Sequence, residues 1–561
     1  MKHFNIITLL AALLILSSCQ INKEPDTDAV FKNITKVYQL NNDGSVNYQY
    51  QHELKYLTHY AFNRAYGETF VIYNPKKQDL TINKAETRMS NGKIVESPDN
   101  ALNEILPHTV IGSPEYNHLR EMVITHVGLE VGATVNLDYE IKTETGYYPF
   151  LADNIVLNEK SPVQNQKIVV KIPKDKTLNY KLLNSNVEPK ISDNNNFTIY
   201  TWKFNDISAS TQDYSKPHEG SYLPRLIFST SDMKNALADL KNNTDIALSE
   251  NIKTKVNKAL QETEKTINKI TTIKKILANI NTINVPIEHT GYKPNSLKHI
   301  WESNRATVLE KNLLFIELLK HANINAELLF AYPTFSFDKK IGNLKDFGHY
   351  YVKTKLDSQA VILSLDTKQK NDLAFNLEKT ILVNINGEIV DLCKNISDIE
   401  NKLSFVTNLK LAKDGSVKGD IKAKIVGEAN PYFDLLKDEN NAKQIISSVA
   451  KNKMIEDFEL ENFDFSSSNV TATIKCNEIW EKQGNYYFIN LPNSTLGIKK
   501  SYLYALGNNR NSPLKLNSKI NETYEYGIKL PDSLHFVNPV KQELTNEIGS
   551  VVINSNLDNN I

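Results

Sequence analysis

Cysteine is scarce in this chain, with three among 561 residues. Cys19 lies in the N-terminal leader described below, so only Cys393 and Cys476 remain in the folded part. This excludes a disulfide framework beyond that one pairing, and it excludes metal sites of the CxxC type. HExxH motifs, Walker loops and GxGxxG loops after a strand are also missing. We therefore expect neither a bound metal nor a cofactor.

Net charge is missing as well, because 65 basic side chains balance 65 acidic ones. A chain without a net field is not drawn to nucleic acid by long-range electrostatics, so we expect no nucleic-acid partner. The length exceeds what one hydrophobic core usually supports, and it predicts about three domains.

An apolar run of membrane-spanning length is absent too. The run from Ile6 to Leu16, after a short basic start, is about half of the ~20 residues that a helix needs to cross a bilayer. Residues 1–18 are therefore interpreted as a secretory signal peptide. The sequence Leu16-Ser17-Ser18-Cys19 resembles a bacterial lipobox, which implies cleavage before Cys19 and lipidation of its thiol. The alternative is an ordinary signal peptide with a chance cysteine.

The polar residues 19–30 cannot bury a core, and they predict a flexible tether. With the lipid on Cys19, this arrangement predicts a protein of the cell envelope that meets the membrane through its N-terminal anchor. The residues after the cysteine resemble those that sort such proteins to the outer membrane, on its periplasmic side or at the cell surface.

Three regions of different periodicity follow. Residues 31–230 alternate apolar and polar side chains in short runs separated by turns, which favours an N-terminal β-sandwich. Residues 231–395 predict a central α+β domain. There, an amphipathic lysine-rich helix is expected from Ile252 to Ile280, with a solvated polar face or, as an alternative, membrane contact. Residues 396–561 again predict short strands, and hence a C-terminal β domain.

A second helix is predicted from Val308 to His321, with a wide apolar surface that should be deeply buried. Thr307 and Glu310 form a T-x-x-E capping box, which would make Val308 the first helical residue.

The blocks at residues 60–70 and 126–133 resemble a family of Bacteroidetes envelope proteins. This family joins a domain of unknown function (DUF3857), a transglutaminase-like domain and a further β domain of the DUF3858 type. The resemblance implies a transglutaminase/papain-like fold for the central domain. Members commonly continue past the equivalent of Ile561, which implies that the last strands of the C-terminal domain are missing here.

In active members of the transglutaminase-like superfamily, a cysteine nucleophile opens the buried helix. The resemblance places Val308 at that position. A thiol at a helix start would be activated by the exposed N–H groups and the helix dipole, but valine has no lone pair to offer and cannot form an acyl-enzyme.

The same resemblance matches His349 to the base and Asp366 to the carboxylate that orients it, so the triad would lack only its nucleophile. His349 has the alternative of an ordinary hydrogen-bonded histidine, and Asp366 that of a turn residue. Thr307 is interpreted as a cap rather than a substitute nucleophile. Cys393 and Cys476 lie at no helix start, and they are interpreted as core or surface residues.

Three functional hypotheses remain. The first is a non-catalytic module that binds a peptide or glycan in the former cleft, and the second is a hydrolase or transferase that uses His349 and Asp366 with water or a non-cysteine nucleophile. The third is a purely structural envelope lipoprotein. Sugar binding by the many tyrosines is a weaker alternative to their role in half-buried strands.

Overall fold

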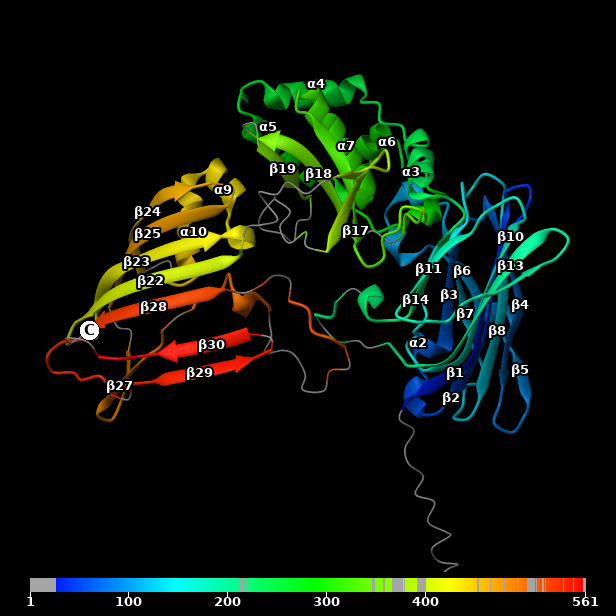
Figure 1. Ribbon diagram of the computed structural model, residues 1–561, viewed down its shortest axis with the longest axis horizontal. Coiled ribbons are helices and arrows are strands. Elements are labelled where there is room, and N and C mark those ends of the chain that lie inside the picture. The colour runs from blue at the N-terminus through cyan, green and yellow to red at the C-terminus, as the bar shows by residue number, and fades with distance from the viewer. Residues whose placement is uncertain are drawn as a thin grey trace, which may run out of the picture.

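The computed structural model is mostly β, with a helical segment in its central part (Figure 1). It describes residues 27–210, 213, 215–217, 219–345, 349–356, 359–365, 377, 379–390, 400–451, 454–464, 466–477, 480–491, 493–501, 510, 512–516, 519, 521–537, 539–547 and 549–557. The predicted signal peptide and Cys19 therefore lie outside the described residues, and so does the outer part of the tether. None of the helices in these ranges combines the length and apolar character needed to cross a membrane.

The N-terminal region is built on one eight-stranded sheet. Only β1 and β10 pair in parallel within it. In spatial order the strands are β12 (Lys190–Asp193), β13 (Phe197–Ile207), β10 (Val163–Pro173), β1 (Ala29–Leu40), β2 (Val46–Tyr56), β8 (Thr134–Thr143), β4 (Gln78–Arg88) and β5 (Ile94–Glu96).

Two three-stranded sheets cover the inner face of this large sheet. Buried side chains of β9 and β14 join those of β1, β2, β10 and β13 in one hydrophobic cluster, and those of β3 and β7 join β8 in another. The small sheets contain β11 (Asn179–Leu183), β14 (Arg225–Ser229) and β9 (Ala152–Val156), and β3 (Glu68–Tyr73), β7 (Arg120–Thr125) and β6 (Leu102–Ile105).

Short helical turns lie in the connections of this region. They are η1 (His59–Ala61), α2 (Arg64–Gly67), η2 (Asp99–Ala101), η3 (His108–Val110), η4 (Pro114–Tyr116) and η5 (Glu219–Ser221). The turns η3 and η4 matter for the site, because they reach the central region.

The central region starts with helices, and one prediction is wrong here. The single helix expected from Ile252 to Ile280 is two helices, α4 (Glu250–Leu260) and α5 (Thr266–Ala278), with a break at 261–265. The break allows each helix to turn its own apolar face inward, so that Ile252 and Val256 are buried together with Ile270, Ile273 and Leu277. The other elements before the sheet are α3 (Met233–Asn242), β15 (Asn281–Thr282), η6 (Ile287–Thr290), α6 (Leu297–Ser303) and β16 (Arg305–Ala306).

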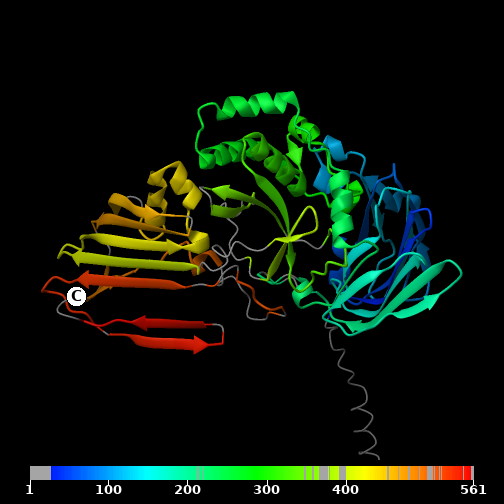
Figure 2. The same ribbon diagram turned by 45° about the horizontal axis from the view of Figure 1, so that its top comes forward.

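The predicted helix from Val308 to His321 is confirmed as α7, with the same bounds. It packs against a five-stranded antiparallel sheet and against α5 and α6 (Figures 1 and 2), and its apolar side chains are at the centre of the largest hydrophobic cluster. In spatial order the sheet contains β19 (Gln359–Leu363), β18 (His349–Leu356), β17 (Ala326–Pro333), β20 (Thr380–Asn384) and β21 (Ile389–Val390).

The C-terminal region is a second β unit, to which helical segments are added. Its sheet contains β24 (Ile455–Phe463), β25 (Ser467–Cys476), β23 (Val417–Val426), β22 (Lys402–Leu411) and β28 (Glu522–Lys529). The segments η7 (Gly427–Ala429), α9 (Tyr432–Lys437), η8 (Glu439–Ala442) and α10 (Lys443–Ser447) precede β24, and α10 packs on the sheet. Two hairpins, β26 (Trp480–Gln483) with β27 (Tyr486–Ile489) and β29 (Lys541–Asn546) with β30 (Gly549–Asn554), and the turn η10 (Ile498–Ser501) complete it.

Candidate functional site

The start of α7 has the geometry that its sequence predicts. The backbone N–H of Glu310 donates to Thr307 Oγ1 over 3.3 Å, and the Thr307 N–H donates to Glu310 Oε2 over 2.7 Å. This reciprocal capping box makes Val308 the first residue of the helix. Val308 is 48% exposed although it is apolar, whereas Leu309 beside it is buried. The position matched to a nucleophile is therefore open at the surface and carries an aliphatic side chain.

Glu310 does more than cap the helix, because its carboxyl group is buried and receives donors from three segments. Tyr116 Oη donates to both oxygens of the carboxyl, at 3.0 and 3.1 Å. The backbone N–H of Asn295 donates to Oε1 over 2.7 Å, and the Asn295 side chain donates to Tyr116 Oη over 2.9 Å. Burial raises the pKa of Tyr116, and the charge of Glu310 raises it further, so that the phenol remains a donor.

Tyr116 belongs to the N-terminal region, 194 residues before Glu310. It lies in η4, whose neighbours Val110 and Leu119 pack with Val285 in a small cluster of their own. The segment from η3 to Leu119 thereby lies against the residues that lead into α7. The N-terminal region thus helps to build the start of α7.

His349 is the first residue of β18 and is exposed. Its pairing partner is Ala331, near the end of β17. The short connection 322–325 turns the chain from α7 back into β17, so the end of β17 lies at the same end of the layer as the start of α7. This topology places His349 at the same end as Val308.

Electrostatics at the next residue agrees with that placement. Burial raises the pKa of Tyr350, and the charge of Glu310 is the second cause of the shift. Tyr350 packs against the hydrophobic cluster that contains Leu309, the second residue of α7. Tyr350 also packs edge-on against Phe330, with the ring centroids 5.6 Å apart.

The segment before β18 is attached to the N-terminal region by an ion cluster. Lys345 Nζ lies 3.1 Å from Asp153 Oδ1 and 3.5 Å from Glu288 Oε1. Burial by itself would lower the pKa of Lys345, but the two carboxylates outweigh it and raise the pKa well above its ordinary value. Asp153 also accepts a hydrogen bond of 2.7 Å from Tyr38 Oη, and its backbone carbonyl accepts one of 2.6 Å from the Asn343 side chain.

The other predicted site residues are not among the described side chains at this end of the central layer. Asp366 and Cys393 lie outside the described residues, so the match of Asp366 to an orienting carboxylate stays a prediction. Cys476 is the last residue of β25 in the C-terminal sheet, far along the chain from α7 and at no helix start. In the part of the chain that the structure describes, no cluster of three or more His, Cys, Asp or Glu side chains could hold a metal ion.

Three described side chains begin or cap the elements at this end of the central layer. An exposed apolar side chain begins α7, an exposed imidazole begins β18, and Thr307 Oγ1 is engaged as a helix cap. The sequence predicted these positions but not the roles of Tyr116 and Asp153. These two residues of the N-terminal region bind Glu310 at the start of α7 and Lys345 before β18. The only local signal for either residue is that it follows a turn-rich segment. Periodicity does not predict contacts between residues so far apart in the sequence.

Comparison with known proteins gives a family match and many similar solved structures, and two of these structures follow. The family model of DUF3857, a domain of unknown function with a solved structure, matches residues 42–211. A structure from Parabacteroides distasonis, described as that of a candidate protease, is 28% identical, with a TM-score of 0.61, and covers 80% of this chain and 94% of that chain. The two proteins thus share their fold over most of their length.

A candidate cysteine protease from Cytophaga hutchinsonii is 12% identical, with a TM-score of 0.20, and covers 42% of this chain and 82% of that chain. That likeness is too weak to indicate a shared fold. No curated protein matches the chain.

Proposed function

We propose that this chain is a lipid-anchored protein of the cell envelope, attached at Cys19 and located at the outer membrane, whose central region binds a peptide or glycan without cleaving it. The observation that carries the proposal is Val308, an exposed aliphatic residue at the first position of a capped, buried helix. In a transglutaminase-like enzyme, this is the position from which a thiolate attacks. Valine has neither a lone pair nor a proton to lose, so a bound acyl group would not be transferred to it.

The surroundings of Val308 support a binding role. The first turn of α7 is held by Glu310, Tyr116 and Asn295, so its position does not depend on a ligand. A preformed surface loses less conformational entropy on binding. Ile111, on the segment that packs beside this turn, is 64% exposed and adds a second apolar side chain.

One experiment asks whether the site keeps a catalytic shape. Val308→Cys, made in a soluble chain in which the other cysteines are serine, would be treated with iodoacetamide at pH 7. We expect faster labelling than at Thr266→Cys, the partly exposed first residue of α5, and we expect His349→Ala to remove the difference. Equal rates at both positions would contradict a disarmed transglutaminase-like site.

Binding itself is tested on an immobilised library of peptides and glycans. We expect a defined ligand set, and we expect Val308→Asp to weaken its capture at least tenfold, because a charge would replace the apolar contact. Capture that is unaffected by Val308→Asp would place binding elsewhere and leave the central region as a spacer.

A second candidate function is hydrolysis by water activated at His349. The likeness to the Parabacteroides distasonis structure favours it, since that protein is described as a candidate protease. Peptide hydrolysis that is unchanged in Val308→Ala and lost in His349→Ala would select this alternative.

A further inference from the structure

Exposed aromatic side chains gather at one end of the N-terminal region. Tyr60, in η1, is 83% exposed, more than any other large apolar or aromatic side chain among the described residues. Phe62, directly after η1, is exposed as well. Phe70 is a third exposed ring, and it lies next to α2, because the Arg64 guanidinium stands over it at 4.8 Å from the centroid. We call residues 58–64 the aromatic turn.

The conformation of the aromatic turn is fixed by the fold. The N–H of Ala61 donates to the carbonyl of Thr58 over 3.3 Å, and Ala61 itself is fully buried. The side chain of Asn63 donates to the Tyr60 carbonyl over 2.6 Å. The ring of Tyr60 therefore projects into solvent from a backbone that is held in place on both sides.

The aromatic turn adjoins the start of the described chain. The N–H groups of Leu57 and Thr58 donate to the Asp28 carbonyl, at 2.8 and 3.2 Å, and Thr58 Oγ1 donates to Asp28 Oδ1 over 2.6 Å. Cys19 is nine residues before Asp28. Even a fully extended chain of that length spans at most about 32 Å. A lipid on Cys19 would therefore keep the aromatic turn close to the bilayer.

Charges of both signs surround the aromatic turn. Arg64 Nε lies 3.0 Å from Glu68 Oε2, the Asp28 carboxylate is beside Thr58, and the Lys160 ammonium lies over the aromatic ring of α2 at 4.4 Å from its centroid. This mixture gives no reason to expect attraction to anionic lipids. The exposed rings suit the membrane interface instead, because a tyrosine ring is apolar and its hydroxyl stays in contact with water.

We propose that the aromatic turn inserts Tyr60 and Phe62 into the interfacial layer of the membrane that carries the anchor. This inference rests on the lipid at Cys19 proposed above. The anchor keeps the turn at a high effective concentration beside the bilayer, so a weak contact is enough. The contact determines which end of the N-terminal region faces the membrane, and it thereby orients the site at α7.

The test follows the surroundings of a dye at Ala65, an exposed residue of α2. Ala65→Cys keeps Tyr60 and Phe62 in place, and it would carry an NBD dye in a soluble chain whose other cysteines are serine. A histidine tag in place of Cys19 binds this chain to phosphatidylcholine vesicles that contain a nickel-chelating lipid. We expect the NBD fluorescence to rise about threefold on binding, because the aromatic turn carries the dye into the interface.

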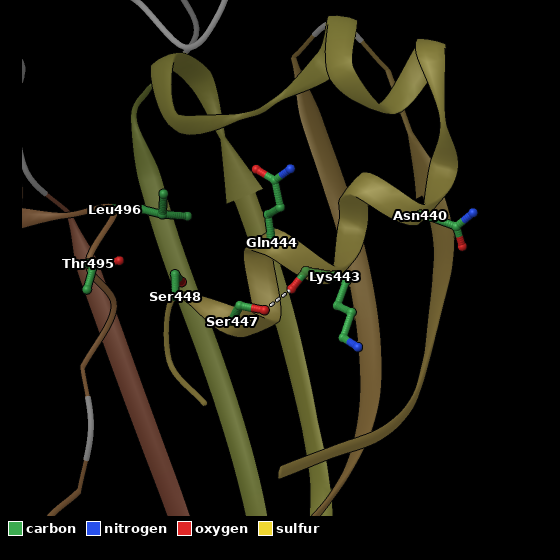
Figure 3. A pocket seen from close by; sticks show the side chains of 7 residues that line it. All are labelled: Asn440, Lys443, Gln444, Ser447, Ser448, Thr495 and Leu496. Atoms are coloured by element: carbon green, nitrogen blue, oxygen red, sulfur yellow. Dashed lines mark hydrogen bonds between the residues drawn. The ribbon is translucent and has the colours of Figure 1, made fainter. Parts of the chain in front are cut away.

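The controls come from the C-terminal region, which lies at the other end of the molecule from the N-terminal region (Figures 1 and 2). Asn440 is exposed beside a mostly polar cavity of about 350 Å³ (Figure 3), and a dye at Asn440→Cys should not brighten. Tyr486, in β27, is 59% exposed. In the chain labelled at Ala65→Cys, Tyr60→Asp should abolish the rise and the matched Tyr486→Asp should leave it, with circular dichroism confirming that both variants are folded.

The proposal is overturned if the dye at Ala65→Cys does not brighten on the vesicles, if the dye at Asn440→Cys brightens equally, or if Tyr60→Asp and Tyr486→Asp behave alike. These results do not depend on lipidation, because the tag replaces the native lipid. The anchor is tested separately, by incorporation of radioactive palmitate into the full-length chain expressed in a bacterium, which Cys19→Ser should abolish. Absence of this label from the unmodified chain would contradict the anchor, whereas a failed dye experiment contradicts the membrane contact of the aromatic turn.

Discussion

The start of α7 and the start of β18 are both attached to the N-terminal region, but by different chemistry. At α7, a buried carboxyl group collects neutral donors from Tyr116, Asn295 and Thr307. Before β18, Lys345 forms a largely buried ion pair with Asp153. Hydrogen bonds can be removed one at a time, whereas removing one member of an ion pair leaves the other charge buried and unpaired. The two attachments should therefore respond differently to substitution.

The largest effect is expected at the ion cluster. Lys345→Met leaves Asp153 and Glu288 without their cation, and we expect it to lower the free energy of unfolding by about 3–5 kcal/mol in urea titrations. Asp153→Asn in the same chain should restore part of the loss. Lys77→Met serves as the control, because the Lys77–Glu144 pair is exposed and should matter little. Equal losses for Lys345→Met and Lys77→Met would show that the cluster is not buried in solution.

Acid should weaken both attachments together, because the N-terminal region that supplies them contains two buried histidines. Burial is the main cause that lowers the pKa of His52 to about 3 and that of His126 to about 4. Their rings lie 6.1 Å apart, and His126 Nε2 is 3.0 Å from Thr69 Oγ1. Both are neutral in the folded chain at pH 7.

In the unfolded chain these histidines take up protons near pH 6.5, so the unfolded state binds more protons as the pH falls. Their contribution to stability is complete above pH 6.5 and is lost between pH 6.5 and about pH 3. We expect a loss of roughly 2–4 kcal/mol by pH 5, measured by urea titration at each pH. His52→Leu combined with His126→Leu should flatten this dependence, and an unchanged slope in that variant would contradict the assignment.

At α7 we expect Glu310→Ala to cost about 3 kcal/mol, since it removes half of the capping box and leaves buried donors of Tyr116 and Asn295 unpaired. Thermal unfolding of the variant gives this value. Glu317→Ala, on the same helix and in an exposed pair with Lys320, should shift the transition far less. A small effect at Glu310 would mean that the α7 start is held by its apolar packing alone.

The smallest effect is expected for Tyr116→Phe, which keeps the ring and removes only the hydroxyl. A loss of about 1 kcal/mol should appear in thermal unfolding, as for one hydrogen bond. Because the two regions meet here, limited proteolysis between residues 106 and 119 should also become faster. If stability and proteolysis rate both stay unchanged, Tyr116 does not connect the regions.

The difference between the two attachments also shows what the sequence could predict. Thr307 and Glu310 are three residues apart, so their capping box and the bounds of α7 could be predicted from local rules. The contacts of Glu310 with Tyr116 and of Lys345 with Asp153 join residues 194 and 192 positions apart, and no local pattern encodes them.

In other parts of the chain, hydrophobic periodicity limited how well the helices and strands could be predicted. β17 is buried at nearly every residue, so it shows little alternation from which its bounds could be predicted. The break at 261–265 escaped prediction because apolar residues continue at helical spacing across it, and the short helices α9 and α10 are too brief for a period to emerge.

The central claim of the account is that the central region binds its ligand without covalent chemistry. Measuring catalytic turnover tests this claim most directly. The unmodified soluble chain, incubated with a peptide library at pH 7, is analysed by mass spectrometry for cleaved, cross-linked and enzyme-bound peptides. The account predicts retention of selected peptides or glycans and no product or adduct above the level of His349→Ala. Multiple turnovers that His349→Ala abolishes would contradict it.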